Sequence, residues 1–173
     1  AYERVVTLKS PLAGVAGIYL SKAARAQGRL ETAVSWMQWV RKRSFPPNVE
    51  QMARDEAALV QAELMSLGLA AYEGGVYPKA ISSFEKVGTL DGDAQLAAQA
   101  ELMKGLSFLR EDRSEQAHAE FVAAMSLGSP VPGVQEYARY FSDPAFTGFT
   151  GKLIGYHGRT NREGLGENIG CIG

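Results

Sequence analysis

Residues 64–87 read LMSLGLAAYEGGVYPKAISSFEKV, and this stretch predicts two helices joined by a tight turn. Gly74 and Gly75 mark the end of the first helix, because glycine tolerates the positive φ that a helix C-terminus often requires. Pro78 suits the first turn of the second helix, where its missing N–H would have had no helical acceptor. We therefore expect a helical hairpin that turns at the glycine pair.

Small side chains on both helices predict how closely the two pack. Antiparallel helices approach closely only where side chains are small, and Gly68 on the first helix and Ala80 on the second meet this condition. Leu64, Leu67 and Phe84 are then expected to fill the seam between the helices. The stretch thus predicts a close-packed helix pair.

The same stretch resembles the tetratricopeptide repeat. The Leu-Gly pair, turn glycine, aromatic, small, aromatic and closing small positions of that repeat are matched by Leu67, Gly68, Gly75, Tyr77, Ala80, Phe84 and Val87. The resemblance covers about residues 12–128. It implies an all-α fold, namely a right-handed α-solenoid of about three such helix pairs with a capping helix and an irregular C-terminal tail.

The residues before the stretch repeat its pattern. At the equivalent positions stand Leu20, Gly28, Leu30, Ala33, Met37 and Val40. Ser21 replaces the glycine of the Leu-Gly pair, and because it is small, close packing is still expected. We expect helices at about 12–27 and 30–43.

The spacing between the first two repeats predicts one unusually long helix. Ala33 and Ala80 lie 47 residues apart, against a repeat length of about 34 residues. A long first helix in the second repeat, at about 49–73 with Asn48 as its N-cap, accommodates the excess. Its apolar face is expected to be extended by Met52, Leu59 and Val60.

A third repeat follows with a weaker match. The matching residues are Gly105, Phe108, Ala117, Phe121 and Ala124. Asp93 is a plausible N-cap, and Asp112 followed by Glu115 resembles a capping box, so helices are expected near 94–110 and 113–127.

These observations predict the organisation of the whole chain. The repeats are expected at about 12–45, 48–90 and 93–130 and a cap at 132–142, which together give a repeat domain of residues 1–142 and a C-terminal extension of residues 143–173. The extension contains eight of the 19 glycines and lacks helical periodicity, so we expect a loop or tail there. Residues 1–8 resemble the second helix of a preceding repeat, and a short capping helix is the alternative.

Composition excludes several classes of function. The chain has 173 residues, 46% hydrophobic and 21% charged, with a net charge of −1, which argues against nucleic acid or an anionic membrane as the main partner. Trp36 and Trp39 beside the basic residues 41–43 could stack on RNA, but packing between repeats is the favoured interpretation. No apolar run is long enough for a membrane span. The single cysteine, Cys171, leaves the compartment undecided between cytoplasm and periplasm.

In the family that the chain resembles, the first helices of successive repeats line a concave groove for peptides or helices. Register then places ten residues in a partner-binding groove: Ile18, Lys22, Arg25, Met65, Leu69, Tyr72, Gln99, Leu102, Leu106 and Leu109. Their apolar character favours an apolar or amphipathic segment of a protein or peptide partner. Burial of this apolar stripe in the core is the alternative. A further candidate occupant is the chain's own extension, docking through Phe146, Phe149, Leu153 and Ile154.

The family's carboxylate clamp, which grips an acidic chaperone C-terminus, is reduced in this chain to a single cation, Lys22. No catalytic residue, cofactor or metal site is predicted, because Cys171, His118 and His157 lack an orienting third group and metal-ligand spacing. The glycine-rich residues 164–170 lack the strand and helix that frame a dinucleotide loop.

The resemblance therefore implies a non-enzymatic protein–protein interaction scaffold or assembly factor that binds a peptide or helix in its groove. The alternative is a regulatory or accessory domain of an enzyme or secretion complex whose catalytic part lies outside this chain. Full-length gene context would discriminate between the two.

Overall fold

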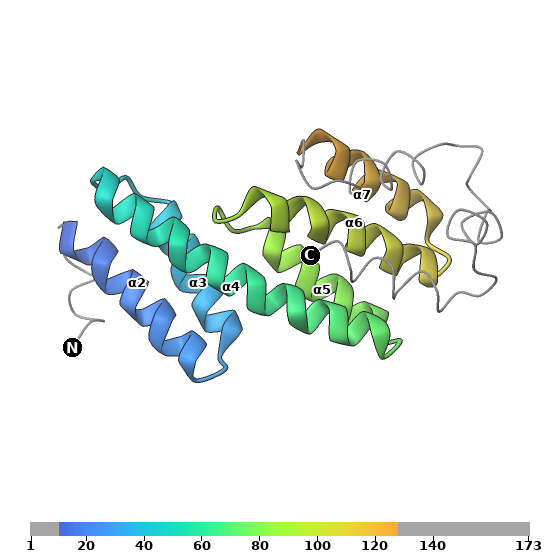
Figure 1. Ribbon diagram of the computed structural model, residues 1–173, viewed down its shortest axis with the longest axis horizontal. Coiled ribbons are helices and arrows are strands. Elements are labelled where there is room, and N and C mark those ends of the chain that lie inside the picture. Colours follow the sequence, from blue (N-terminus) through green and yellow to red (C-terminus); the bar gives the residue numbers. More distant parts are fainter. Residues whose placement is uncertain (1–10, 128–173) are drawn as a thin grey trace.

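The computed structural model describes residues 11–127, and every structural statement below concerns this range (Figure 1). Within it the chain forms six helices and no strand: α2 (Pro11–Ala26), α3 (Leu30–Arg41), α4 (Pro47–Glu73), α5 (Tyr77–Gly88), α6 (Ala94–Arg110) and α7 (Ser114–Ser126). The all-α class predicted from the sequence is confirmed. The expected cap, the C-terminal extension and the expected element at residues 1–8 lie outside the described residues. Among the six helices, none combines the length and the hydropathy that a bilayer span requires.

The six helices form three antiparallel pairs, α2 with α3, α4 with α5, and α6 with α7 (Figure 1). The first helices of the pairs contact one another in order, α2 against α4 and α4 against α6. In addition, α3 packs on α4 and α5 packs on α6. Each helix pair is therefore attached to the next through both of its helices.

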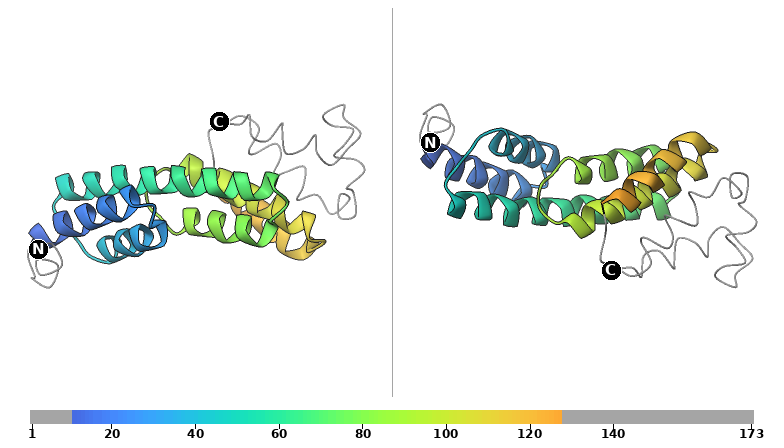
Figure 2. Two further views of the ribbon diagram at one scale, coloured as in Figure 1. Left: turned by 90° about the horizontal axis from the view of Figure 1, so that it is seen from below. Right: turned by 90° about the horizontal axis from the view of Figure 1, so that it is seen from above.

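Helix α4 connects the first pair to the other two. Its 27 residues span about 40 Å at a rise of 1.5 Å per residue. The first half lies beside α2 and α3 and the second half beside α5 and α6 (Figure 2). As predicted, Val60 is fully buried and Met52 packs against the core. Leu59 was predicted on the same apolar face, but it is 50% exposed, because adjacent residues on a helix point about 100° apart.

The helix N-termini agree with the sequence prediction in one case and differ in two. The carboxylate of Asp93 caps α6 by accepting a hydrogen bond of 2.7 Å from the backbone N–H two residues later, as expected. Asn48 does not cap α4, because the helix already begins at Pro47, whose fixed φ suits the first helical position. Asp112 does not cap α7 either, because α7 starts only at Ser114.

The turns inside the three pairs share one backbone geometry. The second residue after each first helix has a positive φ: Gly28 (69°), Gly75 (72°) and Asp112 (58°). The following residue has a φ between −89° and −98° and a ψ of 65° in all three turns. Its N–H donates to the carbonyl five residues earlier over 2.8–2.9 Å, which is the Schellman motif. Asp112 thus adopts the conformation that glycine supplies in the other two turns.

Within the second pair and within the third pair, small residues allow the two helices to approach closely. A Cβ atom at Gly68 would lie 2.4 Å from the ring of Phe84, and one at Gly105 would lie 2.4 Å from the ring of Phe121. Both rings are fully buried. Leu67, which was expected in this seam, is 46% exposed, because it points to a different side of α4 from its neighbour Gly68.

A buried amide fixes the loop between α5 and α6. Gln61 of α4 is fully buried, and its Nε2 donates to the carbonyl oxygens of Val87 (3.0 Å) and Leu90 (3.1 Å). Its Oε1 accepts a hydrogen bond of 2.6 Å from the N–H of Asp93. Gly92 lies so close to α4 that a Cβ would be 2.4 Å from a backbone nitrogen of that helix. The loop is therefore held against the middle of α4.

Candidate functional site

The structure divides the ten predicted groove residues into two groups. Half of them are buried members of the hydrophobic core: Ile18, Met65, Tyr72, Leu102 and Leu106. The other half retain accessible surface: Lys22, Arg25, Leu69, Gln99 and Leu109. The five residues of the first group therefore fit the alternative interpretation, in which the apolar stripe is part of the core.

Arg25 belongs to an ion cluster that joins α2 to α4. Its Nε lies 3.0 Å from Oε1 of Glu56 and its Nη1 lies 2.9 Å from Oε1 of Glu63. The hydroxyl of Ser21 also donates to Glu56, over 3.3 Å. The hydrogen bonds to Glu56 and then to Glu63 raise the pKa of Arg25. Arg25 is therefore a positioning residue between two helices, a role that its register did not suggest.

Tyr72 joins α4 to α6. Its hydroxyl accepts a hydrogen bond of 3.1 Å from Nε of Arg110, and the ring of Tyr77 meets its ring edge to face at a centroid distance of 5.7 Å. Burial raises the pKa of Tyr72, and the nearby Arg110 opposes that rise. Tyr72 was predicted to face a ligand, but its polar and aromatic contacts are made within the protein.

The accessible face of α4 is displaced from the predicted one. Leu59, Ala62, Ser66, Ala70 and Glu73 are all exposed, and their spacing of three or four residues places them on one side of the helix. We call these five residues the α4 strip. Transfer of family positions missed it, although the small residues at 62, 66 and 70, which interrupt the apolar pattern, were a signal that could have found it.

A second charged cluster joins α6 to α7. Nζ of Lys104 lies 2.6 Å from Oε2 of Glu101 and 2.8 Å from Oε2 of Glu120. The Glu101 contact is an ion pair whose angles do not make a hydrogen bond to that buried oxygen. Burial and then the neighbouring Glu120 raise the pKa of Glu101. Burial alone would lower the pKa of Lys104, but the two carboxylates paired with its ammonium outweigh burial and raise that pKa.

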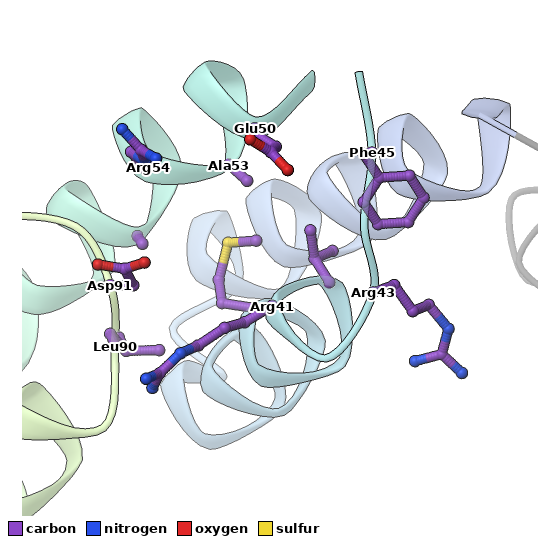
Figure 3. A pocket seen from close by; sticks show the side chains of 11 residues that line it. Arg41, Arg43, Phe45, Glu50, Ala53, Arg54, Leu90 and Asp91 are labelled. Carbon is purple, nitrogen blue, oxygen red and sulfur yellow. The ribbon is translucent and has the colours of Figure 1, made fainter. Parts of the chain in front are cut away.

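A partly open pocket of about 160 Å³ lies between the end of α3, the first half of α4 and the α5–α6 loop (Figure 3). Its apolar lining consists of Met37, Val40, Phe45, Ala53, Ala57 and Leu90. Its charged lining consists of Arg41, Arg43, Glu50, Arg54 and Asp91. We call it the α3–α4 pocket. None of these residues was in the predicted groove, but the 47-residue spacing signalled the lengthened α4 that forms one wall.

The aromatic and basic residues at the end of α3 contact one another. The rings of Trp36 and Trp39 meet edge to face at a centroid distance of 6.0 Å. The guanidinium of Arg43 stacks 3.9 Å from the centre of the Trp39 ring and donates to the Trp39 carbonyl oxygen over 2.9 Å. One face of Trp39 is thus occupied by a side chain of the same helix end.

The described residues contain no arrangement suited to a metal ion formed by three or more His, Cys, Asp or Glu side chains. Of the three residues considered as nucleophile and base, Cys171 and His157 lie outside the described residues. His118 lies on α7, where its Nδ1 is buried and makes no hydrogen bond within residues 11–127.

No family model matches the chain, and neither the curated proteins nor the solved structures gave a match. The family resemblance and the function that it implies therefore depend on the residues and geometry of this chain.

Proposed function

We propose that this chain is a tetratricopeptide-like repeat protein, a right-handed α-solenoid that serves as a non-catalytic scaffold for binding a protein partner. The observation that carries the proposal is the threefold recurrence of one hairpin, with the same Schellman turn at Gly28, Gly75 and Asp112. Glycine facing phenylalanine in two of the pairs supports the same repeat. Repeats stacked in this way create an extended surface along their first helices, and such surfaces bind other proteins.

The proposed binding face runs along the first helices α2, α4 and α6. It comprises the α4 strip and the partly exposed side chains Lys22, Leu69, Gln99 and Leu109. Leu59 and Leu69 offer apolar contact, while Ala62 and Ser66 leave room for the backbone of a bound segment. These features favour an amphipathic helix or an apolar peptide as the ligand. Lys22, whose ammonium lies 5.4 Å from the Tyr19 ring centre, favours an acidic residue at the α2 end.

Affinity capture with a matched pair of surface variants tests the proposal. Ser66→Arg places a long cation in the middle of the α4 strip, and Ser82→Arg places the same side chain on the exposed surface of α5. Partners identified by mass spectrometry should be lost from Ser66→Arg and kept by Ser82→Arg, with equal circular dichroism for both. Equal capture by both folded variants would refute this binding face. A charged substitution at a buried member of the predicted groove, such as Leu106→Glu, would not serve as a test, because Leu106 is only 3% exposed and the variant would disrupt the core.

The extension of residues 143–173 is the competing occupant that the sequence suggested. Deleting residues 145–173 tests it by the binding of a dye that reports exposed apolar surface. Self-docking on this face predicts increased dye binding after the deletion. Adding the excised peptide back should reverse that increase, and should do so more completely than Ser66→Arg does. Unchanged dye binding would leave an external partner as the occupant.

A further inference from the structure

We infer that the α3–α4 pocket is a second binding site, which takes one large apolar side chain from an acidic peptide segment of a partner protein. The pocket lies among α3, the first half of α4 and the α5–α6 loop, whereas the proposed binding face follows α2, α4 and α6. Neither site needs the other, so this inference does not depend on the proposed function.

The size of the pocket selects a side chain over a small-molecule cofactor. Its volume is about 160 Å³, whereas sites for drug-sized ligands and cofactors usually measure about 300–1,000 Å³. An apolar cavity of roughly 150 Å³ accommodates one benzene ring. Met37, Val40 and Leu90 supply apolar surface, and the Phe45 ring stands at one edge of the pocket (Figure 3). One phenylalanine or leucine side chain fits this space.

The charges around the pocket select acidic neighbours for that side chain. Arg41, Arg43 and Arg54 line it, against the carboxylates of Glu50 and Asp91. A fourth cation, Lys42, lies between Arg41 and Arg43 in the sequence and is exposed. Within residues 11–127, Arg54 makes no hydrogen bond or ion pair, so its guanidinium is available to a carboxylate from a ligand. The rim therefore attracts anions and disfavours a basic peptide.

The walls of the pocket are fixed before any ligand arrives. Nη1 of Arg41 donates to the carbonyl oxygen of Thr89 over 3.0 Å, and Nε2 of Gln38 donates to the Thr89 hydroxyl over 3.0 Å. These bonds tie α3 to the α5–α6 loop, while Gln61 ties that loop to α4. A preformed cleft binds a side chain without the entropic cost of ordering its own walls.

Three labelled pentapeptides test the inference by fluorescence anisotropy with the full chain. The sequences are Glu-Glu-Phe-Glu-Glu, Glu-Glu-Ala-Glu-Glu and Lys-Lys-Phe-Lys-Lys. Because burial of one phenylalanine side chain in this pocket is the main apolar contact, the first peptide should bind about 10-fold or more tightly than the second. It should also bind more tightly than the third, and more weakly as salt is added. Equal affinity for the first two peptides, or a preference for the third, would overturn the inference.

Variants then locate the binding site. Arg54→Glu should weaken the acidic phenylalanine peptide about 10-fold, because it replaces an attraction by a repulsion. Ala53→Leu fills the pocket from α4 and should abolish binding while circular dichroism and the unfolding midpoint are retained. Leu69→Glu, on the proposed binding face, should leave this affinity unchanged. Binding that survives Ala53→Leu and Arg54→Glu but is lost in Leu69→Glu would disprove the pocket and leave the proposed face in place.

Discussion

Arg25 of α2 and Glu56 of α4 form a two-point ion pair, with Nε 3.0 Å from Oε1 and Nη2 3.2 Å from Oε2. The Glu56 side chain is fully enclosed, whereas that of Arg25 is 22% exposed. A carboxylate removed from water is tolerated only when it is paired and hydrogen-bonded. The pair therefore fixes where the first helix pair sits along the long helix α4.

Removing one partner of this pair should destabilise the fold strongly. Arg25→Ala leaves the carboxylate of Glu56 buried without its cation, and such changes cost about 3 kcal/mol or more of the free energy of unfolding. The double variant Arg25→Ala/Glu56→Ala should lose less than the sum of the two single losses, because no buried charge then remains. Urea denaturation of the three variants measures both values.

Glu63 provides the control for this prediction. Its carboxylate contacts the same guanidinium at 2.9 Å, but its side chain is 44% exposed. Glu63→Ala should therefore cost less than about 1 kcal/mol, as exposed ion pairs do. If Arg25→Ala cost no more than Glu63→Ala, the account of Glu56 as a buried, dependent charge would be wrong.

A methyl group at Gly68 should destabilise the second helix pair, although alanine favours helices over glycine by about 1 kcal/mol. The added Cβ would lie 2.4 Å from the Phe84 ring, which is fully buried and cannot move away freely. Overpacking of this kind costs about 1–3 kcal/mol. Gly68→Ala should lower the unfolding midpoint, and Phe84→Leu should cost less in the Gly68→Ala background than alone. A midpoint raised by Gly68→Ala would show that helix propensity outweighs the steric contact.

Much of the fold was predictable because certain positions accept only one kind of residue. The pair Gly74 and Gly75 was predicted to supply a position of positive φ, and Gly75 has a φ of 72°. The small residues at 68 and 80 predicted close helix contact, and both are buried. Leu59 and Leu67 were placed wrongly, because each points to a different side of α4 from its buried neighbour, and which side is covered depends on where the other helices sit along α4. That position is set by contacts such as Arg25–Glu56 between residues distant in sequence, which no local pattern reports.

The candidate site was less predictable than the fold for a related reason. Transfer of groove positions assumed a regular stacking of repeats, but 47 residues separate Ala33 and Ala80. Side chains such as Met65 and Tyr72 are buried by neighbouring helices, and the sequence of α4 alone does not say which helices cover it. The α3–α4 pocket is formed by residues 37–57 together with Leu90 and Asp91 of a distant loop, so it could be recognised only once that loop was brought against α3 and α4.

The left-handed residue of the third turn should be improvable. Asp112 has a φ of 58°, where a non-glycine residue is strained, so Asp112→Gly should stabilise the protein by about 0.5 kcal/mol or more. The opposite kind of change at the equivalent turn position, Gly75→Ala, should lower the free energy of unfolding by about 1 kcal/mol. No other atom lies within 4 Å of a Cβ built at Gly75, so this cost would be conformational. Thermal unfolding measures both, and stabilisation by Gly75→Ala would contradict the assigned turn.

The stability of the α6–α7 pair should depend on pH through Glu101. Its folded pKa is raised above the unfolded value of 4.5, so the protonated form favours folding. This contribution is fully present below pH 4.5 and is lost as pH rises through the folded pKa. Glu101→Gln, which resembles the neutral acid, should therefore gain stability relative to the wild type as pH increases from 4 to 7. Urea titrations at several pH values measure the difference, and a gap that narrows with increasing pH would contradict the assignment.

The buried amide of Gln61 should be essential for holding the α5–α6 loop. Replacing its NH₂ group by an oxygen atom removes the hydrogen-bond donor. In Gln61→Glu an ionised carboxylate cannot donate to the carbonyl oxygens of Val87 and Leu90, although it can still accept from the N–H of Asp93. The buried carbonyl oxygen of Leu90 then loses this donor, at about 1–3 kcal/mol, whereas that of Val87 keeps its hydrogen bond from the N–H of Leu90 over 3.2 Å.

The loss in Gln61→Glu should diminish as pH falls, because burial raises the pKa of the new carboxyl and its protonated form can donate again. At pH 7, hydrogen exchange in the α5–α6 loop of the variant should be faster than in the wild type at the same pH. Near pH 4 the variant and the wild type should exchange at similar rates. Gln51→Glu, at an exposed position on the same helix, should change stability by less than about 0.5 kcal/mol. Equal effects of the two substitutions would mean that the loop does not depend on the Gln61 amide. A large loss at Gln61 alone would identify this side chain as the one that holds the loop wall of the α3–α4 pocket in place.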